Sequence, residues 1–210
     1  FGGVVYPVNP DFEAVLGIQC WPDVASLPRT PDLAVVCAAA EKVPGLVRQC
    51  GEAGVLGLVV ISAGFREAGP EGVALEERLR EERRRFEGMR IIGPNCLGLI
   101  APALHLNASF AAGTPKPGNV AFISQSGALC TSVLDWAVKQ NVGFNHFVSV
   151  GEAADVGFHD LIDHFGNDEG TESILIYMES LSDARRFLSA ARAFARTKPI
   201  IVLKAGKTSG

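Results

Sequence analysis

Two serines and a glycine stand at one corner of the chain, where an apolar run ends and a helical pattern begins. The stretch VAFISQSGAL covers residues 120–129, with Ser124, Ser126 and Gly127 at the break. The first N–H groups of a helix have no partner within the helix, and the helix dipole makes this end positive. Hydroxyl groups add donors, and glycine lets an oxygen approach the backbone closely. The corner therefore predicts an anion site suited to a phosphoryl group.

The same corner is compatible with a purely structural role and with a nucleophile. Ser124 or Ser126 could simply cap the helix, which stabilises a protein by about 1 kcal/mol. Residue types alone leave the cap and the phosphate site equally open. A serine nucleophile on a strand-to-helix elbow requires glycine two residues before the serine. Ser124 holds that place before Ser126, so we discount a nucleophile.

Short apolar runs alternate with amphipathic helical patterns along the chain. Most runs are rich in Val and Ile without a period of two, as expected for parallel strands covered on both faces. The expected strands are residues 4–8, 33–37, 56–61, 90–92, 120–123, 144–150, 174–178 and 200–203. This alternation of strands and helices predicts an α/β fold built on doubly wound parallel sheets.

A Pro- and Gly-rich stretch, AAGTPKPGN at residues 111–119, divides the chain. We expect a Rossmann-like domain at residues 1–112, a linker at 113–118 and a flavodoxin-like domain at 119–210. No G-x-G-x-x-G segment is present. We therefore expect the first domain to be truncated, without its first strand and phosphate-binding loop.

The composition narrows the functional class. Nineteen basic against 23 acidic residues give a net charge of −4, which favours neither a nucleic-acid partner nor a charged membrane surface. No apolar run reaches the roughly 20 residues of a membrane-spanning helix. Five cysteines form no C-x-x-C pair, so we expect reduced thiols, a cytoplasmic protein and no metal site. The four histidines, His105, His146, His159 and His164, are interpreted as structural or surface residues.

Five stretches in order along the chain resemble the α-subunit portion of the nucleotide-forming acyl-CoA synthetases. This superfamily includes succinyl-CoA synthetase and ADP-forming acetyl-CoA synthetase. The stretches are VVYPVNP (4–10), VVISAGFREAG (59–69), RIIGPNCLGLI (90–100), VAFISQSGAL (120–129) and ILIYMES (174–180). The resemblance implies a CoA-binding Rossmann-like domain followed by a flavodoxin-like ligase domain that handles a phosphohistidine.

The resemblance also implies roles for individual residues. Ser124, Ser126 and Gly127 would bind the phosphoryl group. Glu179, at the end of an apolar run, would orient the catalytic histidine and is the one expected catalytic residue of this chain. From the residues alone, an ordinary loop carboxylate explains Glu179 better. The expected CoA-binding residues are Asn9, Ala38, Ala39, Ser62, Ala63, Gly64, Phe65, Asn95 and Cys96.

Two features depart from the family pattern. Relatives carry proline-containing residues where this chain has CAAA at residues 37–40, and many carry lysine near Asp11. An acidic residue disfavours the phosphates of coenzyme A, so tight CoA binding is in doubt.

The resemblance places further parts of the enzyme outside these 210 residues. The catalytic histidine usually follows the last strand in an S-H-T-G type segment, which is absent here. An ATP-grasp domain or subunit would bind ATP or ADP with Mg²⁺ and phosphorylate that histidine. We expect an oligomer that interconverts acyl-CoA, ADP and phosphate with carboxylic acid, ATP and CoA. The 210 residues alone are expected to be inactive.

Two alternatives remain. The same module occurs fused to a GNAT-type domain in protein lysine acetyltransferases, where it senses acyl-CoA, and residues 110–136 resemble such fusions equally well. A dinucleotide-binding oxidoreductase is compatible with the fold but is the weaker hypothesis, because no dinucleotide fingerprint supports it.

Overall fold

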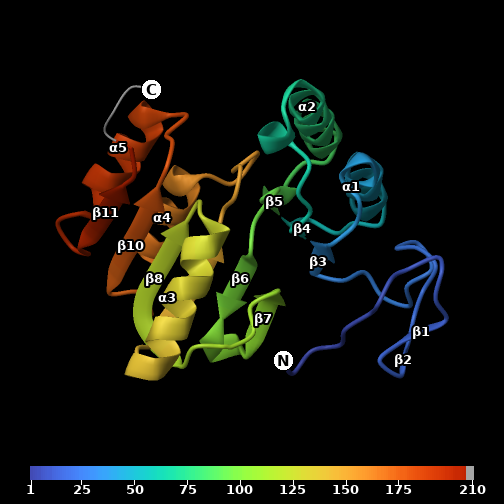
Figure 1. Ribbon diagram of the computed structural model, residues 1–210, viewed down its shortest axis with the longest axis horizontal. Helices are drawn as coiled ribbons and strands as arrows, with labels where there is room; N and C mark the ends of the chain where they lie inside the picture. The colour runs from blue at the N-terminus through green and yellow to red at the C-terminus, as the bar shows by residue number, and fades with distance from the viewer. Residues whose placement is uncertain (207–210) are drawn as a thin grey trace.

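The computed structural model describes residues 1–206, which form two α/β units in sequence (Figure 1). The last four residues of the expected second domain, 207–210, lie outside the described residues. A small antiparallel ribbon of β1 (Ala14–Val15) and β2 (Ile18–Gln19) precedes the first unit. No helix within residues 1–206 has the length and apolar character needed to cross a membrane.

The first unit is a three-stranded parallel sheet with two helices. The strands β3 (Leu33–Val36), β4 (Gly57–Val60) and β5 (Arg90–Ile92) lie in chain order. Helices α1 (Val43–Glu52) and α2 (Pro70–Arg84) lie side by side, and Arg48 on α1 pairs with Glu82 on α2. The core between helices and sheet is fully apolar at its centre, with Val47, Leu58 and Leu79 at most 1 % exposed.

The second unit is a six-stranded sheet in the order β11-β10-β8-β9-β6-β7. Its parallel strands are β8 (Pro117–Ser124), β9 (Phe144–Ser149), β10 (Ser173–Met178) and β11 (Ile200–Lys204). Its antiparallel edge consists of β6 (Gly98–Ala101) and β7 (Leu106–Ser109). The helices are α3 (Gly127–Gln140), α4 (Phe158–Asn167) and α5 (Ala184–Phe194).

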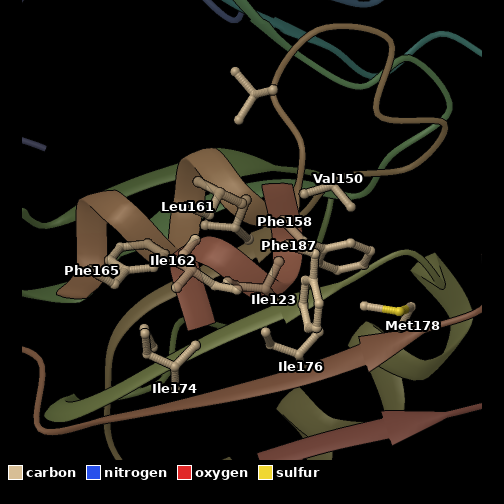
Figure 2. Packing of buried hydrophobic residues seen from close by; sticks show 14 residues of the cluster. Ile123, Val150, Phe158, Leu161, Ile162, Phe165, Ile174, Ile176, Met178 and Phe187 are labelled. Atoms are coloured by element: carbon tan, nitrogen blue, oxygen red, sulfur yellow. The ribbon is translucent and has the colours of Figure 1, made fainter. Parts of the chain in front are cut away.

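Strand β8 is buried on both faces, as its unbroken apolar run predicts. Ala121 and Ile123 belong to the cluster that also contains α4 and α5 residues. Phe122 points to the other face and packs with Cys130 and Leu134 of α3. Figure 2 shows the first of these clusters, in which side chains of α4 lie over Ile123 and the isoleucines of β10. Strand β8 is therefore fixed by packing on both sides, and helix α3 begins directly after the carboxyl end of this strand.

The strand expected at residues 4–8 is wrong. Only Val8 makes an isolated bridge, to Trp21, while Val4 and Val5 are 67 % and 61 % exposed. An apolar run becomes a strand only when a neighbouring strand and a packing layer are available, and within residues 1–206 this run forms a bridge only at Val8.

The hairpin β6–β7 was not predicted, and it changes how the chain is divided. Residues 98–109 fall within the expected first domain, yet β6 pairs with β9 of the second sheet. The expected linker also shortens, because Pro117 and Gly118 already belong to β8. Proline is tolerated at the first position of a strand. The proline and glycine at residues 117 and 118 therefore did not mark a loop, as the linker prediction had assumed. The domain boundary at residues 113–118 stays a prediction.

Candidate functional site

The carboxyl ends of β8 and β10 lie side by side and carry the expected phosphate-binding residues and Glu179. In the parallel ladder, Ser124 is paired with Tyr177. Neighbouring strands are about 4.8 Å apart. Ser126 and Glu179 each follow this pair by two residues, so the structure brings them to one edge of the sheet. Open α/β sheets bind ligands at this edge.

Serine hydroxyls shape the beginning of α3. Ser126 is the N-cap, and its Oγ accepts a hydrogen bond from the Leu129 N–H at 3.4 Å. Ser124 is fully buried; its Oγ accepts from the Ser126 N–H at 3.0 Å and its O–H donates to the Ser126 carbonyl at 3.1 Å. The proton of Ser124 is therefore used internally, which differs from the expectation that both hydroxyls face an anion.

Two backbone donors remain free at the tip of α3. Within residues 1–206, the N–H groups of Gly127 and Ala128 have no hydrogen-bond partner. An atom placed at the Cβ position of Gly127 would meet nothing within 4 Å, and Ala128 is exposed. The side chain of Ser126 thus caps the helix without covering its tip. The two free N–H groups and the positive end of the helix dipole face a space large enough for an oxygen atom.

Glu179 lies in a turn just after β10 and is exposed. Its N–H donates to Gln125 Oε1 at 2.6 Å, and its carbonyl accepts from Lys204 Nζ at 2.8 Å. No hydrogen bond or ion pair holds its carboxylate among the described residues. Gln125 was not identified from the sequence, because its contacts join positions 54 and 55 residues apart.

The expected coenzyme residues follow the carboxyl ends of β3, β4 and β5, so the parallel sheet gathers most of them at one edge. Asn95 N–H donates to the Ser62 carbonyl at 2.9 Å, which joins two of these loops. Ala39 and Ala63 are exposed. Phe65 is fully buried in the core, so only its backbone can face a ligand.

Asn9 stands apart from this group. Its N–H donates to the Trp21 carbonyl at 2.8 Å, and its Oδ1 accepts from the Asp11 N–H at 2.9 Å. No hydrogen bond within residues 1–206 connects Asn9 to the loops after β3, β4 or β5. Its place in a coenzyme site stays a prediction.

Cys96 is a packing residue. It is 4 % exposed, its Sγ lies 3.3 Å from the Val60 carbonyl, and burial raises its pKa to about 12. Burial likewise raises the pKa of Cys130 to about 11, although hydrogen bonds with Ser124 and Ser149 oppose the shift. Both thiols are protonated at neutral pH, and a thiol without thiolate character is a poor nucleophile. All five cysteines are free.

The segment after β9 connects the two halves of the site. Val150 N–H donates to the Ser124 carbonyl at 2.8 Å, and Glu152 N–H donates to the Pro94 carbonyl at 3.0 Å. Glu152 also accepts from Asn95 Nδ2 at 3.4 Å. Gly151 has φ 53°, and a Cβ there would stand 2.2 Å from the Pro94 oxygen. Only glycine permits this approach, which places the Asn95 loop next to the corner at residues 124–127.

The described residues contain no cluster of three or more His, Cys, Asp or Glu side chains arranged to hold a metal ion. The free N–H groups of Gly127 and Ala128 at the α3 tip are suited to binding an anion. The carboxylate of Glu179 lies in the turn after the neighbouring strand β10, and the loops after β3, β4 and β5 lie across the 150–154 segment.

Two families of known proteins match the chain, one over each part. Residues 2–102 match the family described as CoA binding domain. Residues 117–210 match the family described as succinyl-CoA ligase like flavodoxin domain.

Relatives that match along the whole of this chain agree with both family matches. The chain is 45 % identical over 208 residues to acetate–CoA ligase [ADP-forming] I of Archaeoglobus fulgidus, covering 99 % of this chain and 30 % of the relative. It is 43 % identical over 207 residues to the α subunit of acetate–CoA ligase [ADP-forming] II of Pyrococcus furiosus, covering 99 % of this chain and 45 % of that subunit.

A solved structure shares the fold closely. The dinucleotide-forming acetyl-coenzyme A synthetase 1 of Candidatus Korarchaeum cryptofilum, in complex with phosphate and ADP, superimposes with a TM-score of 0.93 at 42 % identity. The match covers 99 % of this chain and 45 % of the synthetase chain. The chain thus spans less than half the length of these relatives. With both halves matched in order and identity above 40 % to each of these proteins, the chain belongs to the nucleotide-forming acyl-CoA synthetase superfamily.

Proposed function

We propose that this chain is the CoA-binding and phosphoryl-handling part of an ADP-forming acyl-CoA synthetase. The observation that carries the proposal is the pair of unpartnered N–H groups on Gly127 and Ala128, at the tip of a helix that begins at the end of a buried central strand. A fixed pair of donors in a positive field stabilises a transferring phosphoryl group better than it stabilises a neutral ligand. Relatives named as ADP-forming ligases support the same proposal.

The complete reaction would proceed in three transfers. A phosphate oxygen attacks the thioester carbonyl, the C–S bond breaks, and CoA leaves as the thiol while an acyl phosphate forms. A histidine nitrogen then attacks phosphorus, the P–O bond to the acyl group breaks, and the carboxylate leaves. Finally a phosphate oxygen of ADP attacks the phosphohistidine, the P–N bond breaks, and ATP forms.

Residues of this chain would hold and orient the reacting groups. The phosphoryl oxygens would be bound by the N–H groups of Gly127 and Ala128 and by the hydroxyl of Ser126. Ser124 would hold the Ser126 backbone in place through its two hydrogen bonds. The carboxylate of Glu179 would orient the histidine, as an ionised group suits a ring that must become a nucleophile. The loops with Ala38, Ser62 to Gly64 and Asn95 would face coenzyme A.

The remaining parts belong to the rest of the protein. We propose that an ATP-grasp domain or subunit supplies the ATP or ADP site with Mg²⁺, and that the histidine lies on a segment outside residues 1–210. The free thiols favour a cytoplasmic location.

A substitution that removes one amide proton tests the phosphate site. Proline suits the first position of a helix, and Ser126 already has the extended φ −89°, ψ 115° that a residue before proline requires. Gly127→Pro should therefore fold normally yet lack the Gly127 N–H. Loss of one such donor costs about 10² to 10³ in rate. Gly127→Ala keeps the N–H and is the matched control.

The measurement is the uptake of acid-labile phosphate from labelled ATP by the full-length protein with its ATP-grasp part. We expect uptake by the wild type and by Gly127→Ala, and roughly 100-fold or more slower uptake by Gly127→Pro. If the wild type takes up no phosphate, the synthetase proposal fails. Binding of acetyl-CoA without any uptake would instead favour the acyl-CoA-sensing module of a GNAT-type acetyltransferase.

A further inference from the structure

Gln125 makes an unusual set of contacts for a residue between two serines of a phosphate corner. Its Oε1 accepts from two consecutive N–H groups, those of Glu179 at 2.6 Å and Ser180 at 2.9 Å. Its Nε2 donates to Ser180 Oγ at 3.2 Å. Its own N–H donates to the Tyr177 carbonyl at 3.2 Å. One side chain therefore holds the turn that carries Glu179.

The opposite side of the same turn is held by Lys204. Its Nζ donates to the Glu179 carbonyl at 2.8 Å and also bonds the Ala205 carbonyl. The backbone of Glu179 is thus fixed through both its N–H and its C=O. The carboxylate itself has no hydrogen bond or ion pair among the described residues and stays available.

The hydrogen bonds from Gln125 to Glu179 and Ser180, here called the clamp, lie where they can affect function as well as structure. Gln125 lies directly before the N-cap Ser126, whose helix tip carries the two free amide donors. The clamp therefore sets the distance between that tip and Glu179, because its hydrogen bonds join the two ends directly. The turn itself is exposed, so its N–H groups would be satisfied by water without Gln125. Folding alone does not need an amide side chain here.

We propose that Gln125 is a positioning residue, which holds the Glu179 turn beside the tip of α3 so that the carboxylate orients the histidine that carries the phosphoryl group. The proposal rests on the proposed function, since it assigns Glu179 to the phosphoryl transfer. A carboxamide is suited to this position because it accepts two N–H bonds and donates one without adding charge beside an anion site. A carboxylate would accept the same bonds but would repel both the phosphoryl group and Glu179.

The first test measures the clamp without any catalytic activity. Gln125→Met preserves the length of the side chain and removes both polar functions. We expect amide hydrogen exchange at Glu179 and Ser180 to become roughly tenfold faster or more in this variant, because both N–H groups lose their acceptor. Gln140→Met is the matched control, since Gln140 is exposed at the other end of α3, about 20 Å away. Unchanged exchange at both amides in Gln125→Met overturns the proposal.

The second test asks whether the clamp acts through Glu179. In the full-length enzyme we expect Gln125→Met to lower kcat for phosphoryl transfer by roughly tenfold to 100-fold, since a misplaced group loses about that much, while the KM values for ADP and CoA stay within about twofold. Glu179→Gln should be slow as well. The double variant should be no slower than Glu179→Gln alone, because the clamp has nothing left to position.

The outcomes separate the two proposals. Wild-type turnover in Gln125→Met, or multiplied losses in the double variant, overturns the role of Gln125 and leaves the synthetase proposal intact. No phosphate uptake by the wild type overturns the synthetase proposal and with it the positioning role, even if exchange shows the clamp to be real.

Discussion

At the scale of single residues, the two serines of the corner at residues 124–127 have different structural roles. Ser126 caps the helix and keeps a hydroxyl at the surface of the corner, whereas the hydroxyl of Ser124 is buried and bonds to the Ser126 backbone. The sequence left a cap and a phosphate site as alternatives. The structure shows that capping leaves two amides free, so a cap and an anion site are compatible.

Ser124→Ala tests the internal role of this serine. The change removes the buried hydroxyl of Ser124. The N–H and the carbonyl of Ser126 each lose one hydrogen bond as a result. Leaving such groups without a partner costs about 1–3 kcal/mol, and we expect the free energy of unfolding in urea to fall by that amount.

Ser132→Ala, on helix α3, is the control. Ser132 is exposed, and its O–H only donates to the Ala128 carbonyl at 3.2 Å. Its loss should change stability by less than about 0.5 kcal/mol. Equal effects of the two substitutions would contradict the buried role of Ser124.

At the scale of elements, the packing of α4 on β9 includes a histidine whose burial disfavours its charged form, which lowers its pKa. The ring of His146 on β9 lies 5.1 Å from that of Phe165 on α4. Its Nδ1 is buried without a hydrogen-bond partner among the described residues. Burial lowers the pKa of His146, the nearby His164 lowers it further, and the charge of Asp168 opposes the shift.

His146→Phe should make stability less sensitive to pH. In the unfolded chain His146 takes up a proton near its ordinary pKa of 6.5, while the folded state resists protonation. The wild type therefore loses stability as the pH falls through 6.5, and the loss stops below the lowered folded-state pKa. We expect the variant to keep more of its free energy of unfolding at about pH 5.5 than the wild type, relative to about pH 8.

Urea unfolding at several pH values provides the measurement. His105→Asn is the control, because His105 is exposed and its left-handed backbone, φ 51°, suits asparagine. At about pH 8 the control should keep its free energy of unfolding within about 0.5 kcal/mol of the wild type. A variant His146→Phe whose stability falls as steeply as that of the wild type between about pH 8 and pH 5.5 would show that His146 titrates normally.

At the scale of the whole molecule, the two sheets are joined by a carboxylate on the loop between β9 and α4. Asp155 Oδ2 accepts from the Ile91 N–H of β5 at 2.8 Å and from Arg90 Nε at 3.1 Å. Its Oδ1 lies 3.3 Å from Arg83 of α2. Next to it, the Ala154 carbonyl accepts from Arg80 Nε at 3.0 Å. The same loop that touches the phosphate corner is thus tied to the first unit.

Asp155→Ala should weaken this connection between the units. The substitution leaves the buried Ile91 N–H without an acceptor, which costs about 1–3 kcal/mol. We expect the first unit to unfold at a lower urea concentration than the second. Single-tryptophan variants give the measurement, since Trp136 lies on α3 and Trp21 lies in the segment before β3.

Asp163→Ala, an exposed change on α4, provides the comparison. Its two tryptophan signals should follow the wild-type curves. Coincident and unshifted transitions in Asp155→Ala would show that the units are joined by contacts that do not involve this carboxylate.

Local patterns predicted much of this molecule, because they depend on neighbours along the chain. The unbroken apolar run of β8 implied a strand covered on both faces, and the serine and glycine after it implied the start of a helix. The same reasoning failed at residues 4–8, where an apolar run lacks a strand beside it, and at β6–β7, whose place is set by pairing with β9.

The arrangement of the site was decided by tertiary structure. Which amides stay free at the α3 tip, that Gln125 holds the Glu179 turn, and that residues 150–154 join the corner to the Asn95 loop all follow from strand order and register. These contacts link residues far apart along the chain, and no local preference specifies them. Residue types thus predicted an anion site in an α/β protein, whereas only the packed sheet determined which atoms lie at that corner.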